Sequence, residues 1–394
     1  MPALKPLKTL RAAACHVAPV FLDATKTTEK CVSLIKESGR NGANLVVFPE
    51  SYIAAFPIWS ALRSPAENHN LFKRMAQESV FADSNKIAHV RRAAKEAGVM
   101  VSLGFSEMAR YSSATLWNSN VFIDENGKVL NHHRKLVPTF FEKLTWSPGD
   151  GYGLRVVPSN YGKIGNLICG ENTNPLARYT LMAQGEQVHI SSWPPVWPTR
   201  FLGAQSNLDE EASRLEDSQS KNYDNVYANL VRAAAHCFEA KCFGILCSGF
   251  LDQAAIDIIA EGASNEESVR KTLASSQKGA SMFLDPTGRP IPGFTITEGI
   301  RKDAEMLQNE EGVLYADFHV EDGIEGKQYH DVVGGYQRFD VFDLHVNRRR
   351  QKPIDFSRAC DEDPAQDDQL ESGTSFRSTK RRAKVMISKV VTRT

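Results

Sequence analysis

The sequence predicts an α/β fold built on a mixed sheet. Segments with helical periodicity alternate with short apolar runs that are typical of buried strands. Two further pairs of strand-like runs are joined by tight turns, which adds antiparallel strands to the parallel ones. No linker divides the 394 residues, and 42% hydrophobic with 24% charged residues is typical of a chain with a packed core.

The first half of the chain is expected to form two rounds of helix and strand, and then a hairpin. A helix that begins at residue 28 carries an apolar face and ends at Gly39. The run "NLVVF" (44–48) after it predicts a strand buried on both faces. The other elements expected here are strands at 10–20 and 99–107, a helix at 86–98, and a hairpin at 119–135 that turns at Asn126-Gly127.

The second half continues the alternation around a short helix. Asn174 caps this helix, Leu176, Tyr179 and Ala183 share one apolar face, and Gly185 ends it. The polar segment 203–224 is expected to be an insertion or an exposed loop. The remaining predicted elements are strands at 162–169, 186–193, 242–249 and 311–320, a helix at 225–241 and a hairpin at 280–291.

Composition excludes several classes of protein. Lys+Arg and Asp+Glu both number 47, which argues against a general nucleic-acid binder. No apolar stretch approaches the roughly 18 residues that span a membrane. The seven scattered cysteines do not resemble a disulfide framework, so we expect the reducing cytoplasm, with Cys237, Cys242 and Cys247 as buried structural thiols.

The chain is expected to form one domain over 1–347, followed by a tail. Residues 348–394 lose periodicity, with an acidic stretch "DEDPAQDDQLESG" and a basic stretch "KRRAKVMISK". Such a segment is typical of a tail that is disordered or docked in an oligomer. The basic run 348–352 at its start is expected to be solvated.

Cys169 is the first candidate for chemistry. It follows the apolar run "IGNLI" and precedes a helix, so it stands at the carboxyl end of a strand, where α/β folds bind ligands. The nearby helix N-terminus favours a thiolate. A small buried residue in an ordinary strand-to-helix turn fits the same position equally well.

Glu50 and Lys135 also stand at strand ends. Glu50 directly follows "NLVVFP", where burial would raise its pKa towards that of a general base. Lys135 ends "KVLNHHRK" and carries the charge that stabilises a developing anion. Taken singly, Glu50 also fits a helix cap and Lys135 an exposed strand end. Together with Cys169 they supply base, cation and nucleophile, with the backbone N–H of Gly170 as an oxyanion donor.

At these residues the sequence resembles the nitrilase superfamily of carbon–nitrogen hydrolases. Glu50 in "VVFPES", Lys135 in "HHRKLVPT" and Cys169 in "ICGEN" match its three signature elements in type and spacing, within a resemblance that covers residues 8–347. Three further stretches resemble the nitrilase branch rather than its amidase relatives: "PTFFEKLTWSPGDG" (138–151), "ENTNPLARYTLMAQGEQVHISSWP" (171–194) and "YHDVVGGYQRFDVFDLHVN" (329–347).

The resemblance implies a four-layer α-β-β-α sandwich with mixed sheets. It implies Glu50 as base, Lys135 as charge stabiliser and Cys169 as nucleophile. It also implies that Glu142 positions the lysine and the substrate. The implied reaction hydrolyses a small or aryl-bearing nitrile to the carboxylic acid and ammonia, with water as co-substrate and a thioimidate and a thioester as intermediates. Neither a metal nor an organic cofactor is implied.

The resemblance also bears on assembly and on the pocket. Family members usually pair through helices and often extend into spirals, so we expect a homo-oligomer built from dimers. Aromatic residues flank the three motifs, and core packing is the alternative role for each of them. The predicted substrate-binding residues are Tyr52, Thr139, Trp146, Gly170, Asn172 and Trp193.

Two positions depart from the family pattern. Gly170 stands where a Trp usually follows the cysteine, and Gly335 stands where a His is usual. These departures bear on substrate range and product. The same triad also fits an amidase, or a nitrile or cyanide hydratase whose tetrahedral intermediate expels the thiol and releases an amide. An inactive oligomer-forming scaffold is the alternative from another class, and the intact set of three argues against it.

The histidines do not form an evident metal site. His132 and His133 are adjacent on a predicted strand, so their side chains point to opposite faces. His236 lies on a predicted helix and is expected in the core or in an interface. No metal ligands are therefore predicted.

Overall fold

The computed structural model describes residues 7–200 and 223–353. Of these, residues up to Gln351 belong to one compact unit. Most of the predicted insertion at 203–224 and all of the predicted tail beyond residue 353 lie outside the described residues, so both remain predictions. None of the helices in the described part of the chain combines the length and the apolar character needed to cross a membrane.

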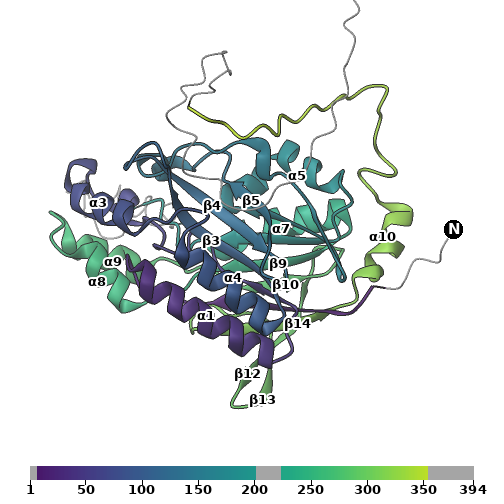
Figure 1. Ribbon diagram of the computed structural model, residues 1–394, viewed down its shortest axis with the longest axis horizontal. Coiled ribbons are helices and arrows are strands. Elements are labelled where there is room, and N and C mark those ends of the chain that lie inside the picture. Colours follow the sequence, from purple (N-terminus) through teal and green to yellow (C-terminus); the bar gives the residue numbers. More distant parts are fainter. Residues whose placement is uncertain (1–6, 201–222, 354–394) are drawn as a thin grey trace, which may run out of the picture. The chain divides into compact units, whose positions relative to one another are not determined.

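The elements follow the expected alternation, with additions in the second half (Figure 1). The helices are α1 (Ala24–Arg40), α2 (Trp59–Leu62), α3 (His69–Glu78), α4 (Asn85–Ala97), α5 (Pro175–Met182), α7 (Asn225–Ala240), α8 (Gln253–Ala260), α9 (Glu266–Ser275) and α10 (Gly323–Tyr329). The strands are β1 (Leu10–His16), β2 (Leu45–Val47), β3 (Met100–Met108), β4 (Leu116–Ile123), β5 (Val129–Arg134), β6 (Val157–Ser159), β7 (Gly162–Ile168), β8 (Val188–Trp193), β9 (Phe243–Ser248), β10 (Met282–Leu284), β11 (Pro290–Ile291), β12 (Gly293–Thr297), β13 (Ile300–Ala304) and β14 (Gly312–Phe318).

These strands form two mixed sheets. The first has eight strands in the order β13-β12-β14-β1-β2-β3-β4-β5, and the second has six in the order β11-β10-β9-β8-β7-β6. The β1–β2–β3 and β7–β8–β9 runs are parallel, whereas the flanking pairs are antiparallel. The predicted mixed sheet is therefore confirmed, and both parallel runs carry the βαβ connections that the alternation indicates.

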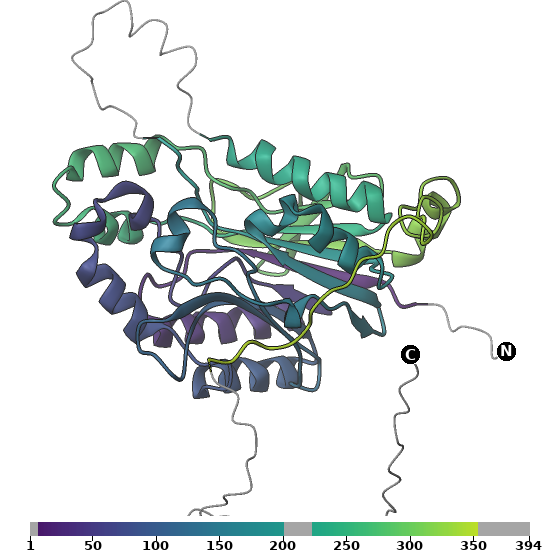
Figure 2. The same cartoon turned by 90° about the horizontal axis from the view of Figure 1, so that it is seen from above.

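The two sheets pack face to face, with helices outside them (Figure 2). Side chains of β1 alternate between the two faces, so Ala13 and Cys15 pack towards the α1 side and Ala12 and Ala14 towards the second sheet. The core between the sheets includes Phe283 from the opposite layer. The implied four-layer α-β-β-α sandwich is confirmed.

The end of α1 differs from the prediction. The helix continues through Gly39 to Arg40, and the left-handed residue beyond it is Gly42, with φ +81°. A Cβ on Gly39 would lie 2.9 Å from the Cβ of Ala97 on α4. The glycine therefore serves the close approach of two helices rather than ending the first one.

The buried face of α5 was also predicted wrongly. Leu176 is 60% exposed and Ala183 is exposed beyond the helix end at Met182, whereas Ala177 and Leu181 pack in the core. The helix carries apolar residues on two faces. Ala177 and Leu181 pack against Leu167 of β7, and Met182 packs in a second cluster with Ile168, so the buried face does not include Leu176.

Two smaller predictions have opposite outcomes. Cys237, Cys242 and Cys247 are buried free thiols, as predicted. The basic run at 348–352 is not simply solvated, because Arg350 is half-buried. Its guanidinium lies 3.1 Å from Oδ1 of Asp150 and donates to the carbonyl of His132 at 2.7 Å. These contacts attach the start of the predicted tail to the main unit.

Candidate active site

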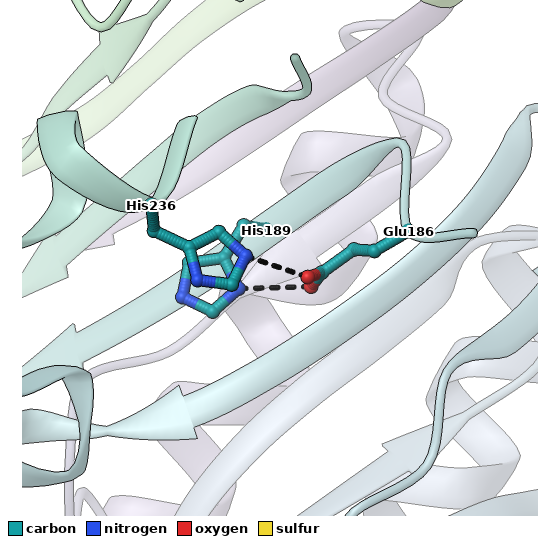
Figure 3. Close-up of side chains that lie close together, drawn as sticks. All are labelled: Glu186, His189 and His236. Atoms are coloured by element: carbon teal, nitrogen blue, oxygen red, sulfur yellow. Dashed lines mark hydrogen bonds and ion pairs between the residues drawn. The ribbon is translucent and has the colours of Figure 1, made fainter. Parts of the chain in front are cut away.

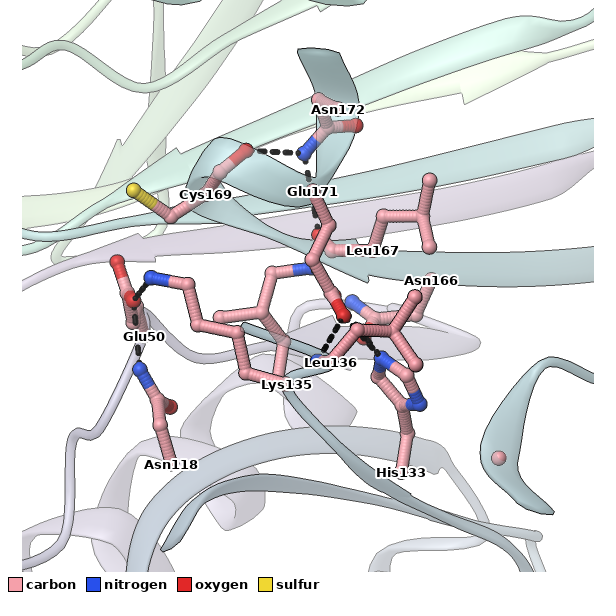
Figure 4. Close-up of polar contacts among 12 residues, drawn as sticks. Glu50, Asn118, His133, Lys135, Leu136, Asn166, Leu167, Cys169, Glu171 and Asn172 are labelled. Carbon is pink, nitrogen blue, oxygen red and sulfur yellow. Dashed lines mark hydrogen bonds and ion pairs between the residues drawn. The ribbon is translucent and has the colours of Figure 1, made fainter. Parts of the chain in front are cut away.

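The three predicted catalytic side chains come together from the two sheets (Figure 4). Glu50 follows β2 and Lys135 follows β5, both in the eight-stranded sheet. Cys169 follows β7 in the six-stranded sheet. All three are buried, with Cys169 6% exposed. The site therefore lies where the carboxyl ends of strands from both sheets meet.

Cys169 is held in an unusual backbone conformation. Its φ is +50°, a left-handed value that side chains rarely adopt, and a short 3-10 turn, Cys169–Thr173, begins there. The amide nitrogen of Asn172 donates to the Cys169 carbonyl at 2.9 Å. Asn174 then caps α5, as predicted, by accepting from two backbone N–H groups of its first turn. A sharp turn of this kind displays the thiol rather than burying it in a continuous element.

Lys135 lies between two carboxylates. Its Nζ is 2.8 Å from Oε1 of Glu50 and 2.6 Å from Oε2 of Glu142. Ligand atoms of Glu50, Glu142 and Cys169 all lie within 4.8 Å of one another. An ammonium has three donors, so one remains for a further acceptor.

A capping arrangement positions Glu142. This residue lies in a short 3-10 helix, Phe140–Leu144, whose N-cap is Thr139. The backbone N–H of Thr139 donates to Oε2 of Glu142 at 3.0 Å, and the backbone N–H of Glu142 donates to the Thr139 carbonyl at 2.9 Å. The oxygen that holds Lys135 is therefore fixed by the local fold.

The environment of Glu50 suits a general base. Burial, and secondarily the charge of Glu142, raise the pKa of Glu50 to about 7, although Lys135 acts in the opposite direction. The amide of Asn118 donates to Oε1 of Glu50 at 2.6 Å, which favours the ionised carboxylate. A base with a pKa near neutrality balances availability against strength.

The pKa values of Cys169 and Lys135 are both shifted by burial and by the neighbouring charged groups. Burial, with the charge of Glu50 added, raises the pKa of the Cys169 thiol well above its ordinary value. Burial alone would lower the pKa of Lys135, but nearby negative charge, that of Cys169 foremost, raises it well above its ordinary value. Cys169 thus lies beside a carboxylate that can accept its proton and an ammonium whose charge favours the thiolate.

Comparison with known proteins gives the family. The family model described as "Carbon-nitrogen hydrolase" matches residues 11–328. A nitrilase from Penicillium rubens is 32% identical over 356 residues, which cover 89% of this chain and 97% of that protein. The chain belongs to the carbon–nitrogen hydrolase family. As a member of its nitrilase branch, it is an enzyme that acts on carbon–nitrogen bonds.

Two further similarities extend this result. A cyanide hydratase from Botryotinia fuckeliana is 29% identical over 349 residues, covering 88% of this chain and 85% of that protein. The crystal structure of a member of branch 10 of the nitrilase superfamily from Saccharomyces cerevisiae matches with a TM-score of 0.57 and 16% identity, covering 86% of this chain and all of that one. The structural match supports the fold of this carbon–nitrogen hydrolase.

A cavity of about 50 Å³ opens beside Cys169. Three of the predicted substrate-binding residues, Thr139, Gly170 and Trp193, line it together with Cys169. Tyr52 instead lines a neighbouring cavity of about 20 Å³ with Glu50.

The other two predicted substrate-binding residues line neither cavity. Trp146 is buried and donates to Oγ of Ser106 at 3.1 Å. Asn172 lies within the 3-10 turn that begins at Cys169, and its amide nitrogen donates to the backbone carbonyls of Leu167 and Cys169. Gly335, the second departure from the family pattern, lies in the turn after α10, where its N–H donates to the carbonyl of Asp331.

Sequence reasoning missed one wall of the main cavity. Asn225, Asn229 and Arg232 line it from α7, and the remaining lining residues are Pro194, Trp197 and Tyr223. Their signal was a polar stripe with the i, i+4, i+7 spacing of one helix face in "NVYANLVR". Arg232 places a guanidinium 4.7 Å from the ring centre of Trp193, so the cavity combines aromatic walls with positive charge.

Two clusters of the described residues bring metal-type ligands together: Glu50, Glu142 and Cys169, and separately Glu186, His189 and His236. In the first, the ammonium of Lys135 lies where a cation would bind. In the second, each carboxylate oxygen lies 2.7–2.8 Å from a ring nitrogen, which is the length of a direct hydrogen bond between the two atoms. Hydrogen bonding accounts for both clusters.

The adjacent histidines point to opposite faces, as predicted. His132 lies 2.8 Å from a carboxylate oxygen of Glu107, and His133 lies 2.9 Å from one of Glu171. Neither His132 nor His133 belongs to a metal-type cluster in the described parts of the chain.

Proposed function

We propose that this enzyme is a nitrilase that hydrolyses an organic nitrile to the carboxylic acid and ammonia. The observation that carries the proposal is the cluster of Glu50, Lys135 and Cys169, with the lysine bound to Glu50 and the thiol beside them. The family membership and the nitrilase relative support it.

Each proposed role follows from position. Cys169 attacks the nitrile carbon while its proton passes to Glu50, and the nitrile nitrogen accepts a proton to give a thioimidate. Water adds to the carbon, the carbon–nitrogen bond breaks, and ammonia leaves a thioester. A second water then releases the acid and restores the thiol, with Glu50 as the base. Lys135, held by Glu142, and the Gly170 N–H stabilise the negative charge of each tetrahedral adduct.

We infer that the substrate is a small or aryl-bearing nitrile. Thr139, Gly170 and Trp193 are proposed to contact it, because they share the cavity of Cys169. Tyr52 and Glu50 line the adjoining cavity, which we propose receives the attacking water. The aromatic walls at Trp193 and Trp197 favour a planar group beside the nitrile.

A nitrile or cyanide hydratase with the same triad is the second candidate function. The cyanide hydratase relative favours it. In that reaction the tetrahedral intermediate expels the thiol instead of ammonia, so the product is an amide. The distinction rests on which bond of one intermediate breaks, and only the product tells the two apart.

The test is a product assay on the full chain. Aliphatic, aromatic and arylaceto nitriles, hydrogen cyanide and the matching amides would be incubated with the protein, and ammonia, acid and amide quantified. Acid and ammonia from nitriles, with amides untouched, is the expected result. Amide accumulation would replace the nitrilase by the hydratase, and activity on amides alone would indicate an amidase.

A pair of cysteine variants tests the mechanism. Cys169→Ala should abolish turnover and leave assembly intact, whereas Cys31→Ala, which removes another buried thiol, should retain turnover. Turnover that survives Cys169→Ala would exclude the proposed nucleophile. If the wild type assembles but turns over no substrate of the panel, the inactive scaffold becomes the better account.

We also propose a homodimer formed through α5 and α7. Leu176 on α5 and Tyr227 on α7 are 60% and 67% exposed, and Arg178 and Glu239 link the two helices by an ion pair at 3.0 Å. This outward apolar surface fits a second copy of the chain. Sedimentation should give a dimer or a larger assembly for the wild type and a monomer for Tyr227→Glu. An unchanged assembly would place the interface elsewhere.

A further inference from the structure

Glu186, His189 and His236 form a second buried polar cluster (Figure 3). Glu186 lies two residues before β8, His189 lies on β8 and His236 lies on α7. Oε1 of Glu186 is 2.8 Å from Nδ1 of His189, and Oε2 is 2.7 Å from Nε2 of His236. The two rings stack with centres 3.6 Å apart. All three side chains are buried, and none belongs to the proposed catalytic set.

The fold makes room for this cluster. A Cβ on Gly165 of β7 would lie 2.0 Å from Oε1 of Glu186, so only glycine leaves space for the carboxylate. Burial alone would raise the pKa of Glu186, but His189 and His236 lower it to about 2. The carboxylate is therefore ionised in the interior, at a place where a buried charge needs a partner.

The cluster reaches Cys169 through Asn172. Nε2 of His189 lies 2.8 Å from Oδ1 of Asn172, which also accepts from Oγ of Ser191 at 3.0 Å. The amide nitrogen of Asn172 donates to the carbonyl of Cys169 at 2.9 Å and to that of Leu167 at 3.3 Å (Figure 4). One side chain thus connects the imidazole to the backbone of the nucleophile.

These contacts determine which atoms carry protons. The two backbone carbonyls fix the Asn172 amide, because a flipped amide would set its oxygen against both. Oδ1 therefore faces His189, whose Nε2 must donate, while Nδ1 donates to the carboxylate. His189 thus carries two protons. Nδ1 of His236 has no hydrogen-bond partner in the described residues, so a single proton on Nε2 suffices there.

We propose that Glu186, His189 and His236 are positioning residues, in which a buried imidazolium at His189 locks Asn172 and thereby the peptide that follows Cys169. This peptide joins the Cys169 carbonyl to the Gly170 N–H. In a trans peptide these two groups point in opposite directions, so fixing the carbonyl also aims the N–H. The same hydrogen bond holds Cys169 at φ +50°, which keeps its thiol directed at Glu50 and Lys135. The inference rests on the proposed function in taking Cys169 as the nucleophile.

The test replaces the donor without changing its shape. Asn172→Asp keeps both partners of Oδ1 but sets a second oxygen against the carbonyls of Cys169 and Leu167. We expect kcat to fall about 100-fold with KM within about 3-fold of wild type, because small displacements of a reacting group cost this much. Ser191→Ala, which removes the other partner of Oδ1, should change both constants less than about 3-fold.

A second readout does not depend on nitrile turnover. The alkylation rate of Cys169 by iodoacetamide, with Cys169→Ala as the blank, should fall at least about 10-fold in Asn172→Asp and stay near wild type in Ser191→Ala. If the wild type is alkylated normally but hydrolyses no nitrile, the proposed function fails. The alkylation rates of the variants then test by themselves whether Asn172 positions Cys169. The proposal would be overturned by an Asn172→Asp protein that melts at a lower temperature but, while folded, has the Cys169 alkylation rate and the turnover of wild type.

A third measurement needs no folded Asn172 variant. Solid-state nitrogen NMR of wild-type protein labelled in histidine reports protonation of each ring nitrogen, with the His189 signals assigned by their loss in His189→Gln. Two protonated nitrogens at His189 are expected, because both ring nitrogens face acceptors. A bare Nδ1 or Nε2 would overturn the proposal.

Discussion

Nε2 of His133 lies 2.9 Å from Oε2 of Glu171, and this buried pair joins the two sheets next to the site (Figure 4). The same carboxylate accepts from the N–H of Ile168 at 2.8 Å and from that of Leu136 at 2.5 Å. Ile168 precedes the nucleophile and Leu136 follows the lysine. One side chain therefore sets the spacing between Lys135 and Cys169. Burial alone would raise the pKa of Glu171, but His133 and the two N–H groups lower it.

Glu171→Gln should weaken both fold and catalysis. The amide that replaces one carboxylate oxygen would present a donor to a backbone N–H, which leaves buried donors unpaired. We expect a loss of roughly 2–4 kcal/mol in the free energy of unfolding and a lower kcat. Denaturant unfolding and steady-state kinetics measure both, with the exposed Glu267→Gln as the matched control. If Glu171→Gln unfolds and turns over like wild type, then Glu171 does not join the segment after Lys135 to the segment before Cys169.

The rate should depend on the ionisation of Glu50. Its pKa is raised to about 7, foremost by burial, and a base acts only when ionised. We therefore expect kcat/KM to fall as the pH drops through about 7. Asn118→Ala removes a donor that favours the ionised form of Glu50. In this variant the acid limb of the pH profile, where kcat/KM falls at low pH, should move to higher pH.

The matched control for this limb is Asn120→Ala. Asn120 lies on the same strand but bonds Ser102 rather than Glu50, so its loss should leave the limb in place. A wild-type limb near pH 4.5, or a shift to lower pH in Asn118→Ala, would contradict the assignment of Glu50 as base.

Gly170 is coupled to Lys135 through Thr139. A Cβ at residue 170 would lie 2.5 Å from Oγ1 of Thr139, whose N–H holds the Glu142 carboxylate. Gly170→Ala should therefore disturb the lysine and lower kcat about 10-fold. In a Thr139→Ala background the same substitution should cost less than about 3-fold, because the clash is gone. Equal costs in both backgrounds of this double-mutant cycle would rule out the coupling.

Glu107 should contribute stability that acid removes. Burial would raise its pKa, but hydrogen bonds from Arg134 and His132 lower it to about 2. Because this folded pKa lies below the ordinary value of 4.5, the stabilisation is full above about pH 4.5 and is lost as the pH falls towards 2. Glu107→Gln should lower the free energy of unfolding at pH 7 by roughly 2–4 kcal/mol.

Urea unfolding of wild type and Glu107→Gln at several pH values checks this expectation. The difference between them should shrink between pH 4.5 and about 2. A difference that stays constant over that range would mean that the side chain acts through packing rather than charge.

The sequence located the candidate site better than its surroundings. Glu50, Lys135 and Cys169 each follow an apolar run, and strand ends are readable from such runs alone. Which strands meet at one edge is a long-range property, and it became predictable only through the resemblance to a family.

The errors have physical causes. The outward face of α5 was misassigned because Leu176 and Leu181 are both apolar and only the packing against Leu167 distinguishes them. Gly39 looked like a helix end because its role depends on a helix distant in sequence. The cluster of Glu186, His189 and His236 left no local sequence signal, since the three residues lie on a loop, a strand and a helix.

Glu50 and Lys135 come from one sheet and Cys169 from the other, so no single layer contains the whole candidate site. The rate of turnover therefore reports whether the two sheets keep their relative position. On gentle heating or in low denaturant, slippage of one layer against the other would silence the enzyme while every helix and strand persisted. Loss of activity should precede loss of the far-ultraviolet circular dichroism signal.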